Sequence, residues 1–278
     1  MHTLDQFIKS ALEEDVYKGD LTTLATIPAI QKGKADCIVK EDCIIAGVEL
    51  AISICNEIND ELVCTFNYKD GDFVKAGETI GTITGSIHAI LKAERLLLNC
   101  MQRMSAIASK TKLYADLVKP FNVLILDTRK TTPNFRICEK WAVLIGGGVN
   151  HRFGLYDAIL IKDNHIEASG GIKNALVNCE LYIMENNLEV PVIVEVKNLE
   201  EFKMAVDFNF VDRILIDNFL PESIHEIIEC NNKRKKIEAS GGINMSNITE
   251  FAKTGVDYIS IGDLTHHVSS IDISLKIK

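Results

Sequence analysis

From about residue 120 onward, short runs of aliphatic residues alternate with amphipathic segments in a regular order. Six runs have the length and composition of buried strands: 123–127, 157–162, 190–196, 213–217, 236–240 and 257–262. A run that is apolar on both faces is typical of a strand in a parallel sheet. The segments 199–208, 221–229 and 245–254 between them have helical patterns. Serial strand–helix units predict a parallel sheet covered by helices.

Polar residues stand at the carboxyl end of each run. In a βα barrel the residues that follow many strands meet on one face, whereas an open sheet collects them at one switch point. Because the polar residues here follow every strand, the sequence favours a barrel. The strand-end residues are Asp127, Thr128, Arg129, Lys130, Lys162, Asp163, Asn164, Glu195, Asp217, Asn218, Glu238, Ser240, Gly241, Gly242, Ile261, Gly262 and Asp263.

Five side chains of this region are cationic or can become so: Arg129, Lys130, His151, Arg152 and Lys162. The whole chain carries a formal net charge of -9, so this concentration points to a bound anion. Arginine offers carboxylate or phosphate a planar fork, and lysine offers a compact charge. The middle strands add two carboxylates, and the sequence therefore predicts a site with a cationic half and an acidic half.

The last two strand ends contain glycine, which leaves backbone N–H groups open to a phosphate. Barrels commonly bind phosphate after their last strands. The pattern predicts a small polyanion beside a phosphorylated sugar, with a magnesium ion reached through Glu195 and Asp217. Magnesium uses only one or two protein carboxylates when substrate phosphates supply its other ligands.

The residues before position 120 have a different pattern. Residues 1–15 predict an amphipathic helix with Leu4, Phe7, Ile8 and Leu12 on one face, and 19–23 predict a polar turn. Short strands are expected at 33–39, 43–47, 62–68, 73–74 and 78–85, which together form a β-rich accessory layer. Residues 89–114 predict a long helix whose apolar surface includes Arg95. A guanidinium beside such a surface requires an anionic partner or water.

Composition excludes several classes of protein. The chain is 47% hydrophobic and 25% charged, and its acidic balance argues against a nucleic-acid binder. The one short basic run, 233–236, is interpreted as a solvated loop. The eight cysteines lack Cys-x-x-Cys and zinc-ligand spacing, which favours reduced thiols. Since we find no signal peptide and no apolar run long enough to span a membrane, we expect a cytoplasmic protein.

Taken together, these segments resemble the quinolinate phosphoribosyltransferase family. The resemblance covers Glu94 and Arg95, Glu195, and the segments 127–133, 146–152, 161–165, 215–219, 238–243 and 255–266, with a weaker match at 19–23. It implies an N-terminal α/β sandwich domain, 1–105, which residues from about 266–278 rejoin. It implies that 106–265 form an incomplete, seven-stranded α/β barrel, one strand more than the apolar runs indicate. It also implies a homodimer or dimer-based oligomer in which Arg95 enters the neighbouring subunit's site.

The family activity is phosphoribosyl transfer from phosphoribosyl pyrophosphate to quinolinate with decarboxylation. The products are nicotinate mononucleotide, pyrophosphate and carbon dioxide, in de novo NAD biosynthesis. The resemblance implies that Lys130, Lys162, Glu195 and Asp217 are catalytic, and that Glu195 and Asp217 serve Mg²⁺ directly or through water. The residues implied to bind quinolinate are Arg95, Arg129, His151, Arg152 and Lys162, and those implied to bind the phosphoribosyl group are Lys130, Glu195 and Asp217. Its phosphate end is assigned to Ser240, Gly241, Gly242, Ile261, Gly262, Asp263 and His266, and Thr128 is a further substrate-binding residue.

Four positions depart from the common family pattern. Asn134 stands where glycine is usual, which is a mild change because asparagine tolerates a positive φ. Ile193 replaces a frequent acidic residue and leaves Glu195 as the acid of its strand. Asp263 and His267 stand where small residues are common, which bears on the details of the phosphate contact.

Three other interpretations are open. A barrel family associated with molybdenum transport shares the Thr-Arg-Lys and Gly-Gly segments, but generally lacks the Lys-Asp-Asn-His segment found here at 162–165. Nicotinate phosphoribosyltransferase couples its reaction to ATP and handles one carboxylate. A metabolite-binding barrel without chemistry would have lost Glu195 or Asp217, and both are present.

Overall fold

The computed structural model describes residues 3–59 and 61–278, which form two compact units. Unit 1 consists of Met1–Lys112, Lys130–Gly147 and Leu264–Lys278, as far as these are described. Unit 2 consists of Leu113–Arg129 and Gly148–Asp263. The chain therefore passes between the units several times, and each unit is described by itself.

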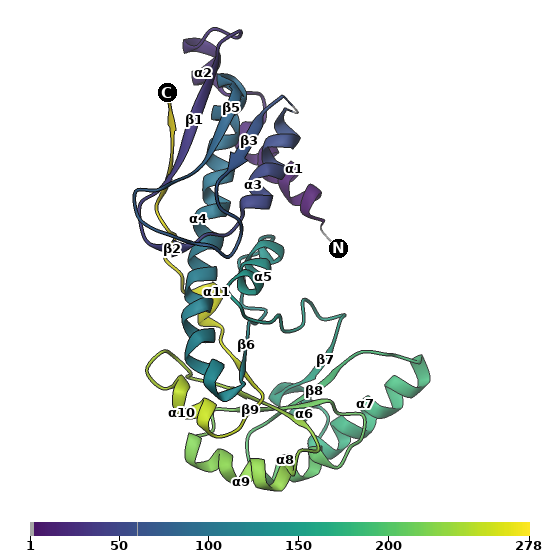
Figure 1. The fold of residues 1–278 in the computed structure, drawn as a ribbon. Helices are drawn as coiled ribbons and strands as arrows, with labels where there is room; N and C mark the ends of the chain where they lie inside the picture. Colours follow the sequence, from purple (N-terminus) through teal and green to yellow (C-terminus); the bar gives the residue numbers. More distant parts are fainter. Residues whose placement is uncertain (1–2, 60) are drawn as a thin grey trace. The chain divides into compact units, whose positions relative to one another are not determined.

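The helices of unit 1 are α1 (Leu4–Val16), α2 (Leu21–Thr26), α3 (Val48–Ile58), α5 (Arg136–Ile145) and most of α4 (Ile87–Val118) (Figure 1). The first two begin at side chains, those of Thr3 and Asp20, that accept a hydrogen bond from a backbone N–H group. On the expected face of α1, Ile8 is buried and the other apolar side chains are half-buried. Residues 19–23 were expected as a turn, and that prediction is wrong in part, because α2 begins at Leu21. Asp20 caps this helix by accepting a hydrogen bond from Thr23 N at 3.0 Å.

The strands of unit 1 lie at the positions expected from the sequence. They are β1 (Lys32–Val39), β2 (Cys43–Ile44), β3 (Val63–Phe66), β4 (Phe73–Val74) and β5 (Thr79–Ser86), joined by β12 (Ile273–Ile277). One antiparallel sheet has the order β12-β1-β5-β3, and β2 pairs with β4. The far C-terminal strand β12 is thus an edge strand beside β1.

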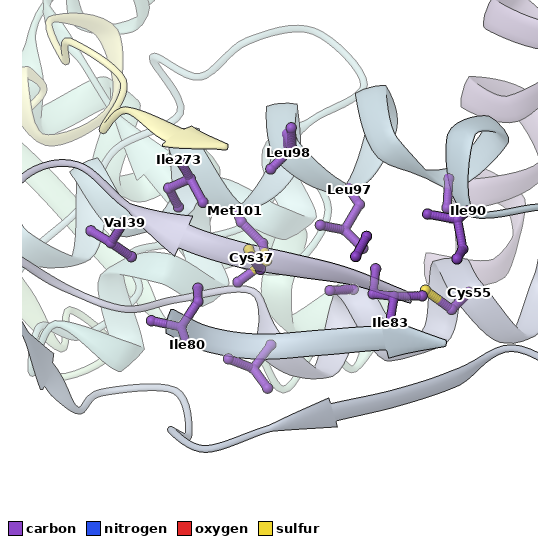
Figure 2. Close-up of a cluster of buried hydrophobic side chains, with 14 of the residues drawn as sticks. Cys37, Val39, Cys55, Ile80, Ile83, Ile90, Leu97, Leu98, Met101 and Ile273 are labelled. Atoms are coloured by element: carbon purple, nitrogen blue, oxygen red, sulfur yellow. The ribbon is translucent and has the colours of Figure 1, made fainter. Parts of the chain in front are cut away.

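The core of unit 1 forms where one face of this sheet meets α4. Alternate residues of β1, such as Cys37 and Val39, point to the same face because strand side chains have a period of two. Figure 2 shows them with Ile80 and Ile83 of β5, and Leu97 and Met101 of α4, in one cluster of buried side chains. Within the part of the chain that is described, all eight cysteines carry free thiols.

Unit 2 is built on six parallel strands, which confirms the six apolar runs of the sequence. They are β6 (Leu124–Leu126), β7 (Ile159–Ile161), β8 (Val192–Val196), β9 (Arg213–Asp217), β10 (Lys236–Ser240) and β11 (Tyr258–Ser260), in the order β6-β11-β10-β9-β8-β7. Because β11 returns to pair with β6, the first and last strands are neighbours, as a barrel requires. A single parallel bridge from Leu126 to Val149 adds a short seventh segment on the other side of β6.

The helices of unit 2 follow their strands in turn. They are α6 (Asp163–Ala168), α7 (Ile172–Asn186), α8 (Leu199–Val206), α9 (Pro221–Asn231), α10 (Ile248–Lys253) and α11 (Asp263–His266), whose last residues belong to unit 1. A 3₁₀ turn, Lys119–Phe121, precedes β6. Figure 1 shows α7, α8 and α9 beside β7, β8 and β9, the helix-outside arrangement of a βα barrel. None of the helices in the described residues is long and apolar enough to cross a membrane.

The unit boundaries differ from the expected domain boundaries in two places. The expected division between residues 105 and 106 falls inside α4, which continues as one helix to Val118. The segment Lys130–Gly147, expected in the barrel domain, clusters with unit 1. A buried ion pair between Arg103 of α4 and Glu139 of α5 is one contact of this segment with the rest of unit 1.

Candidate active site

The strand periodicity of unit 2 aims three expected site residues at the same interior. Leu160, Ile193 and Leu215 of β7, β8 and β9 form one buried cluster. Side chains two positions apart in a strand lie on the same face. The interior face therefore continues, at the carboxyl ends of these strands, with Lys162, Glu195 and Asp217.

The first two of these residues are paired directly. Lys162 Nζ donates a hydrogen bond to Glu195 Oε2 at 2.5 Å. The expected cationic and acidic halves of the site meet at this contact, because β7 and β8 are neighbours in the sheet. The backbone N–H of Lys162 donates to His165 Nδ1 at 3.0 Å. The three-residue separation of Lys162 and His165 therefore lets the His165 side chain cap the start of α6.

The segment after Val149 is held beside β6 by a buried carboxylate. Asp127 is fully buried, and its Oδ1 accepts a hydrogen bond from His151 N at 2.8 Å. Asp157 shapes the following turn by accepting from the backbone N–H groups of residues 153 and 154 at 2.6 and 2.8 Å. These contacts fix the backbone on both sides of Arg152.

Two half-buried arginines approach each other in this region. The pKa of Arg152 is lowered, first by burial and then by repulsion from the charge of Arg129. Arg152 also donates to the carbonyl of Ala158 at 3.3 Å. Two neighbouring guanidinium groups are partly removed from water and repel each other. Binding of an anion relieves this repulsion, so the pair favours an anionic ligand. The sequence predicted an anion site from five cations, and these two arginines are the part of that cluster in which one charge acts on the other.

A buried network below the strand ends was missed from the sequence. Glu238 is fully buried, and its Oε2 accepts from Arg213 Nη1 at 2.9 Å and lies 3.5 Å from His151 Nε2. The His151 Nδ1 atom accepts from the backbone N–H of Arg152 at 2.7 Å, so a proton on the neutral ring resides on Nε2, facing Glu238. Arg213 in turn stacks on the ring of Tyr258 at 4.3 Å. The signal in the sequence was a charged residue, Glu238, between two buried aliphatic neighbours.

The late strand ends bring Ser240 and two glycines to the end of β9. Asn218 N donates to Ser240 O at 2.9 Å. Gly241 has a φ of +93°, and a Cβ there would collide with the Asn218 side chain and lie 2.7 Å from Asn218 N. Only glycine therefore fits this close approach. Asp217 Oδ2 accepts from the Asn218 side chain at 2.7 Å. At the next strand end, Ile261 N donates to Leu126 O at 2.9 Å, and Gly262 and Asp263 follow.

Three expected site residues belong to unit 1. Arg95 of α4 is exposed and lies 4.0 Å from Glu94, its neighbour in the chain, so the side chain reaches water as the sequence required. Lys130 and His266 are also exposed. Among the residues that depart from the family pattern, Asn134 has a φ of 63°, and Ile193 is a member of the interior cluster. The contributions of all the expected site residues, Thr128, Lys130 and His266 among them, to substrate binding stay predictions.

Comparison with known proteins decides the family. The model of the quinolinate phosphoribosyl transferase N-terminal domain matches residues 20–105, and the model of the C-terminal domain matches residues 107–276. The chain belongs to the quinolinate phosphoribosyltransferase family. The family resemblance and the expected fold class are thereby confirmed.

Similarity to individual members extends over nearly the whole chain. It is 44% identical to the chloroplastic nicotinate-nucleotide pyrophosphorylase [carboxylating] of Arabidopsis thaliana, over 99% of this chain and 83% of that protein. It is 39% identical to the probable nicotinate-nucleotide pyrophosphorylase [carboxylating] of Bacillus subtilis, over 95% of this chain and 90% of that one. The crystal structure of NadC from Streptococcus pyogenes matches with a TM-score of 0.93 and 37% identity, covering 99% of this chain and 96% of that chain.

The residues of this family member suit a magnesium ion by their chemistry. Glu195 and Asp217 are carboxylates at neighbouring strand ends, and carboxylate oxygens are hard donors that Mg²⁺ prefers. One oxygen of Glu195 contacts Lys162, one oxygen of Asp217 contacts Asn218, and each carboxylate has a second oxygen. The donor set therefore fits an ion that takes its remaining ligands from phosphates and water.

Proposed function

We propose that this chain transfers a phosphoribosyl group from phosphoribosyl pyrophosphate to the ring nitrogen of quinolinate and releases the 2-carboxylate as carbon dioxide. The products are nicotinate mononucleotide and pyrophosphate, as in de novo NAD biosynthesis. The observation that carries this proposal is the pair of half-buried guanidinium groups of Arg129 and Arg152 near strand ends that also present Lys162. A dianionic aromatic acid matches such a cluster better than an acid with one carboxylate.

Binding and orientation of quinolinate are assigned to the cations of unit 2. The forks of Arg129 and Arg152 bind carboxylate oxygens, and Asp127 and Asp157 keep the backbone around Arg152 fixed while they do so. Lys162 supplies a further positive charge when its ammonium turns from Glu195 to the substrate. A ring held in this way presents its nitrogen to the sugar at a defined angle, which removes much of the entropic cost of bringing the two substrates together.

The sugar carbon becomes positively charged as pyrophosphate leaves. Glu195 and Asp217 lie on the interior face of neighbouring strands, where their negative charges can stabilise an oxocarbenium-like sugar. When the carbon–nitrogen bond forms, the ring nitrogen becomes cationic. The electron pair released as the adjacent carboxylate leaves as carbon dioxide is then stabilised by that nitrogen, and a proton from water replaces the carboxylate on the ring.

Phosphate groups are assigned to the late strand ends. The backbone of Ser240, Gly241 and Gly242 and that of Ile261, Gly262 and Asp263 would receive the 5′-phosphate, with Lys130 and His266 of unit 1 serving the phosphoribosyl donor. A magnesium ion, when bound, would neutralise the pyrophosphate leaving group, and Glu195 and Asp217 would hold it directly or through water.

We further propose that the functional assembly is a homodimer whose sites are shared through Arg95. This arginine is exposed on α4 and has a weak contact to its neighbour in the chain, Glu94. An exposed arginine beside an apolar helix face is suited to enter an anion site on a second copy of the chain. The free thiols of all eight cysteines in the described chain are in keeping with a reducing compartment such as the cytoplasm.

The proposed reaction is tested by incubating the protein with phosphoribosyl pyrophosphate, magnesium and either quinolinate or nicotinate. We expect nicotinate mononucleotide and an equal amount of carbon dioxide from quinolinate, and little product from nicotinate. Quinolinate labelled at the 2-carboxylate would identify which carboxylate leaves. Equal turnover of nicotinate, or product without carbon dioxide, would exclude the proposed reaction.

A further inference from the structure

A buried ion pair in unit 1 joins two segments that are far apart in sequence. Glu139 of α5 is fully buried, and its Oε1 accepts from Arg103 Nε at 3.1 Å and Nη2 at 3.0 Å. Arg103 lies on α4, with about a quarter of its side chain exposed. Burying a carboxylate costs several kcal/mol unless it is paired and its oxygens are hydrogen-bonded, and Glu139 meets both conditions.

On one side the pair holds the segment that follows β6. Glu139 Oε2 accepts from the backbone N–H of Thr132 at 3.0 Å, and Oε1 accepts from the Thr132 hydroxyl at 2.9 Å. Thr132 stands two residues after Lys130. The buried carboxylate therefore makes four hydrogen bonds, two of them to the loop that bears this lysine.

On the other side the pair holds the segment that follows β11. Arg103 Nη1 donates to the carbonyl of Val268 at 3.1 Å, and Nη2 donates to the carbonyl of Thr265. These two residues flank His266. The Thr265 hydroxyl, fully buried, donates to the carbonyl of Lys130 at 2.7 Å and so closes a ring of contacts between the two segments.

We infer that Arg103 and Glu139 are positioning residues that set the backbones of Lys130 and His266 together for the phosphoribosyl donor. The inference rests on the proposed function, which assigns both residues to that substrate. Neither Arg103 nor Glu139 needs to touch the substrate, because each acts through backbone groups of the two segments. One ion pair thus controls two substrate-binding segments, and loosening it moves both.

The Arg103–Glu139 pair affects binding of the phosphoribosyl donor, whereas other residues position the groups that bind quinolinate. The residues assigned to quinolinate within unit 2 are held by Asp127, Asp157 and Glu238, whereas Arg103 and Glu139 bond to segments of unit 1. A substitution that breaks the Arg103–Glu139 pair is therefore expected to raise the KM for phosphoribosyl pyrophosphate and to change the KM for quinolinate far less.

The test uses the full chain and two variants that keep side-chain size, Glu139→Gln and Thr265→Val. We expect each to raise the KM for phosphoribosyl pyrophosphate by about tenfold, with the KM for quinolinate changed by less than about twofold. Thr265→Ser keeps the hydroxyl and should restore the parental value. Hydrogen exchange measured by mass spectrometry should accelerate in residues 130–135 and 264–268 together in Glu139→Gln.

Ser105→Ala is the matched control. Ser105 is a fully buried hydroxyl on the same helix, two residues from Arg103, and it bonds to both backbone groups of Ala46 at 3.0 and 3.2 Å. Its loss should lower stability without a selective change of KM. If Glu139→Gln and Thr265→Val change the two KM values no more selectively than Ser105→Ala, or only one segment exchanges faster, the inference is wrong. Failure of the unaltered chain to use quinolinate would instead overturn the proposed function.

Discussion

At the scale of single residues, Lys162 and Glu195 compensate each other's charge when no ligand is bound. Their contact at 2.5 Å neutralises both side chains while each remains at the end of a neighbouring strand. An arriving anion competes with Glu195 for the ammonium, and a departing one returns it. Under the proposed function, we therefore expect binding of quinolinate to be coupled to exposure of the Glu195 carboxylate.

That coupling predicts different effects for the two carboxylates. Glu195→Gln removes the competitor for Lys162, so we expect quinolinate to bind several-fold tighter by calorimetry, while kcat falls by about 100-fold. Asp217→Asn has no such competitor to remove, and its quinolinate affinity should stay unchanged while kcat falls. Loss of quinolinate binding in Glu195→Gln would show that the carboxylate positions Lys162 rather than competing with its ligand.

Glu238 provides a prediction for stability against pH. Burial acts to raise its pKa, but the hydrogen bond and charge of His151, together with Arg213, outweigh burial and hold the pKa below its usual value of 4.5. A depressed folded-state pKa gives stability that is complete above the unfolded value and is lost as the pH falls through the folded value. Near neutral pH, Glu238→Gln should lower the free energy of unfolding by about 3 kcal/mol, because Arg213 loses its buried partner.

The pH dependence of the free energy of unfolding distinguishes stabilisation by the charge of Glu238 from stabilisation by the packing of its side chain. The difference in free energy of unfolding between parent and Glu238→Gln, measured in urea, should stay constant from neutral pH to about 5 and shrink below it. A difference that persists in acid would mean that the carboxylate stabilises the barrel by packing alone.

Sequence patterns located the residues of the site better than their partners. Period-two strands and a cluster of cations were enough to place Lys162, Glu195 and Asp217. The pairings Arg103–Glu139 and Arg213–Glu238 could not be read, because partners distant in sequence meet only through the fold. The basic run was interpreted as a solvated loop, and Lys233, Arg234 and Lys236 are exposed as that interpretation requires. Lys235 is the exception: its Nζ donates to the carbonyls of residues 208, 209 and 211, and burial lowers its pKa.

At the scale of elements, the strands marked by apolar or alternating residues were recognised, including the two-residue strand β4, whereas the seventh segment of unit 2 was not. Each of the six strands of unit 2 has a run of aliphatic residues that marks it, and each was found. The seventh segment consists of one bridging residue, Val149, in a glycine-rich stretch without a period. Its place is set by backbone bonds to β6 and by the Asp127 carboxylate, which leave no trace in local hydrophobicity.

The turn between β10 and α10 predicts a clear difference between two adjacent glycines. Gly241→Ala would push a methyl group against the backbone N of Asn218, whereas a Cβ at Gly242 would meet open space at a φ of +63°. We expect Gly241→Ala to lower the free energy of unfolding by about 3 kcal/mol and Gly242→Ala by about 1 kcal/mol. Thermal unfolding of the two variants checks this, and equal costs would mean that the Asn218 loop yields easily.

At the scale of the whole molecule, each unit is assembled from segments that are distant in sequence. Unit 1 takes three segments of the chain and unit 2 takes two. Sequence patterns alone could not show this, because the helical pattern of α4 runs without interruption from one unit into the other. The family resemblance supplied the two-domain organisation, and the Arg103–Glu139 pair is one of the contacts that join Lys130–Gly147 to the rest of unit 1.

The shared-site proposal gives a prediction for mixed assemblies. Arg95→Ala and Lys162→Ala should each be nearly inactive as homodimers. After random subunit exchange of equal amounts, about half of the dimers are mixed and each has one intact site, so activity should approach about one quarter of the parental value. An affinity tag on one variant measures the exchange. Exchange without recovery of activity would place Arg95 in the site of its own chain.

The strand β12 has a consequence for how the protein is made. It pairs along the full length from Ala35 to Val39 in β1, yet the ribosome synthesises it only after the entire barrel. Until residues 273–277 emerge, the nascent chain presents the outer edge of β1, with unsatisfied backbone groups, to every other nascent chain nearby. Unit 1 therefore begins before the barrel in the order of synthesis and is completed only after it, because β12 follows the last barrel strand in the chain.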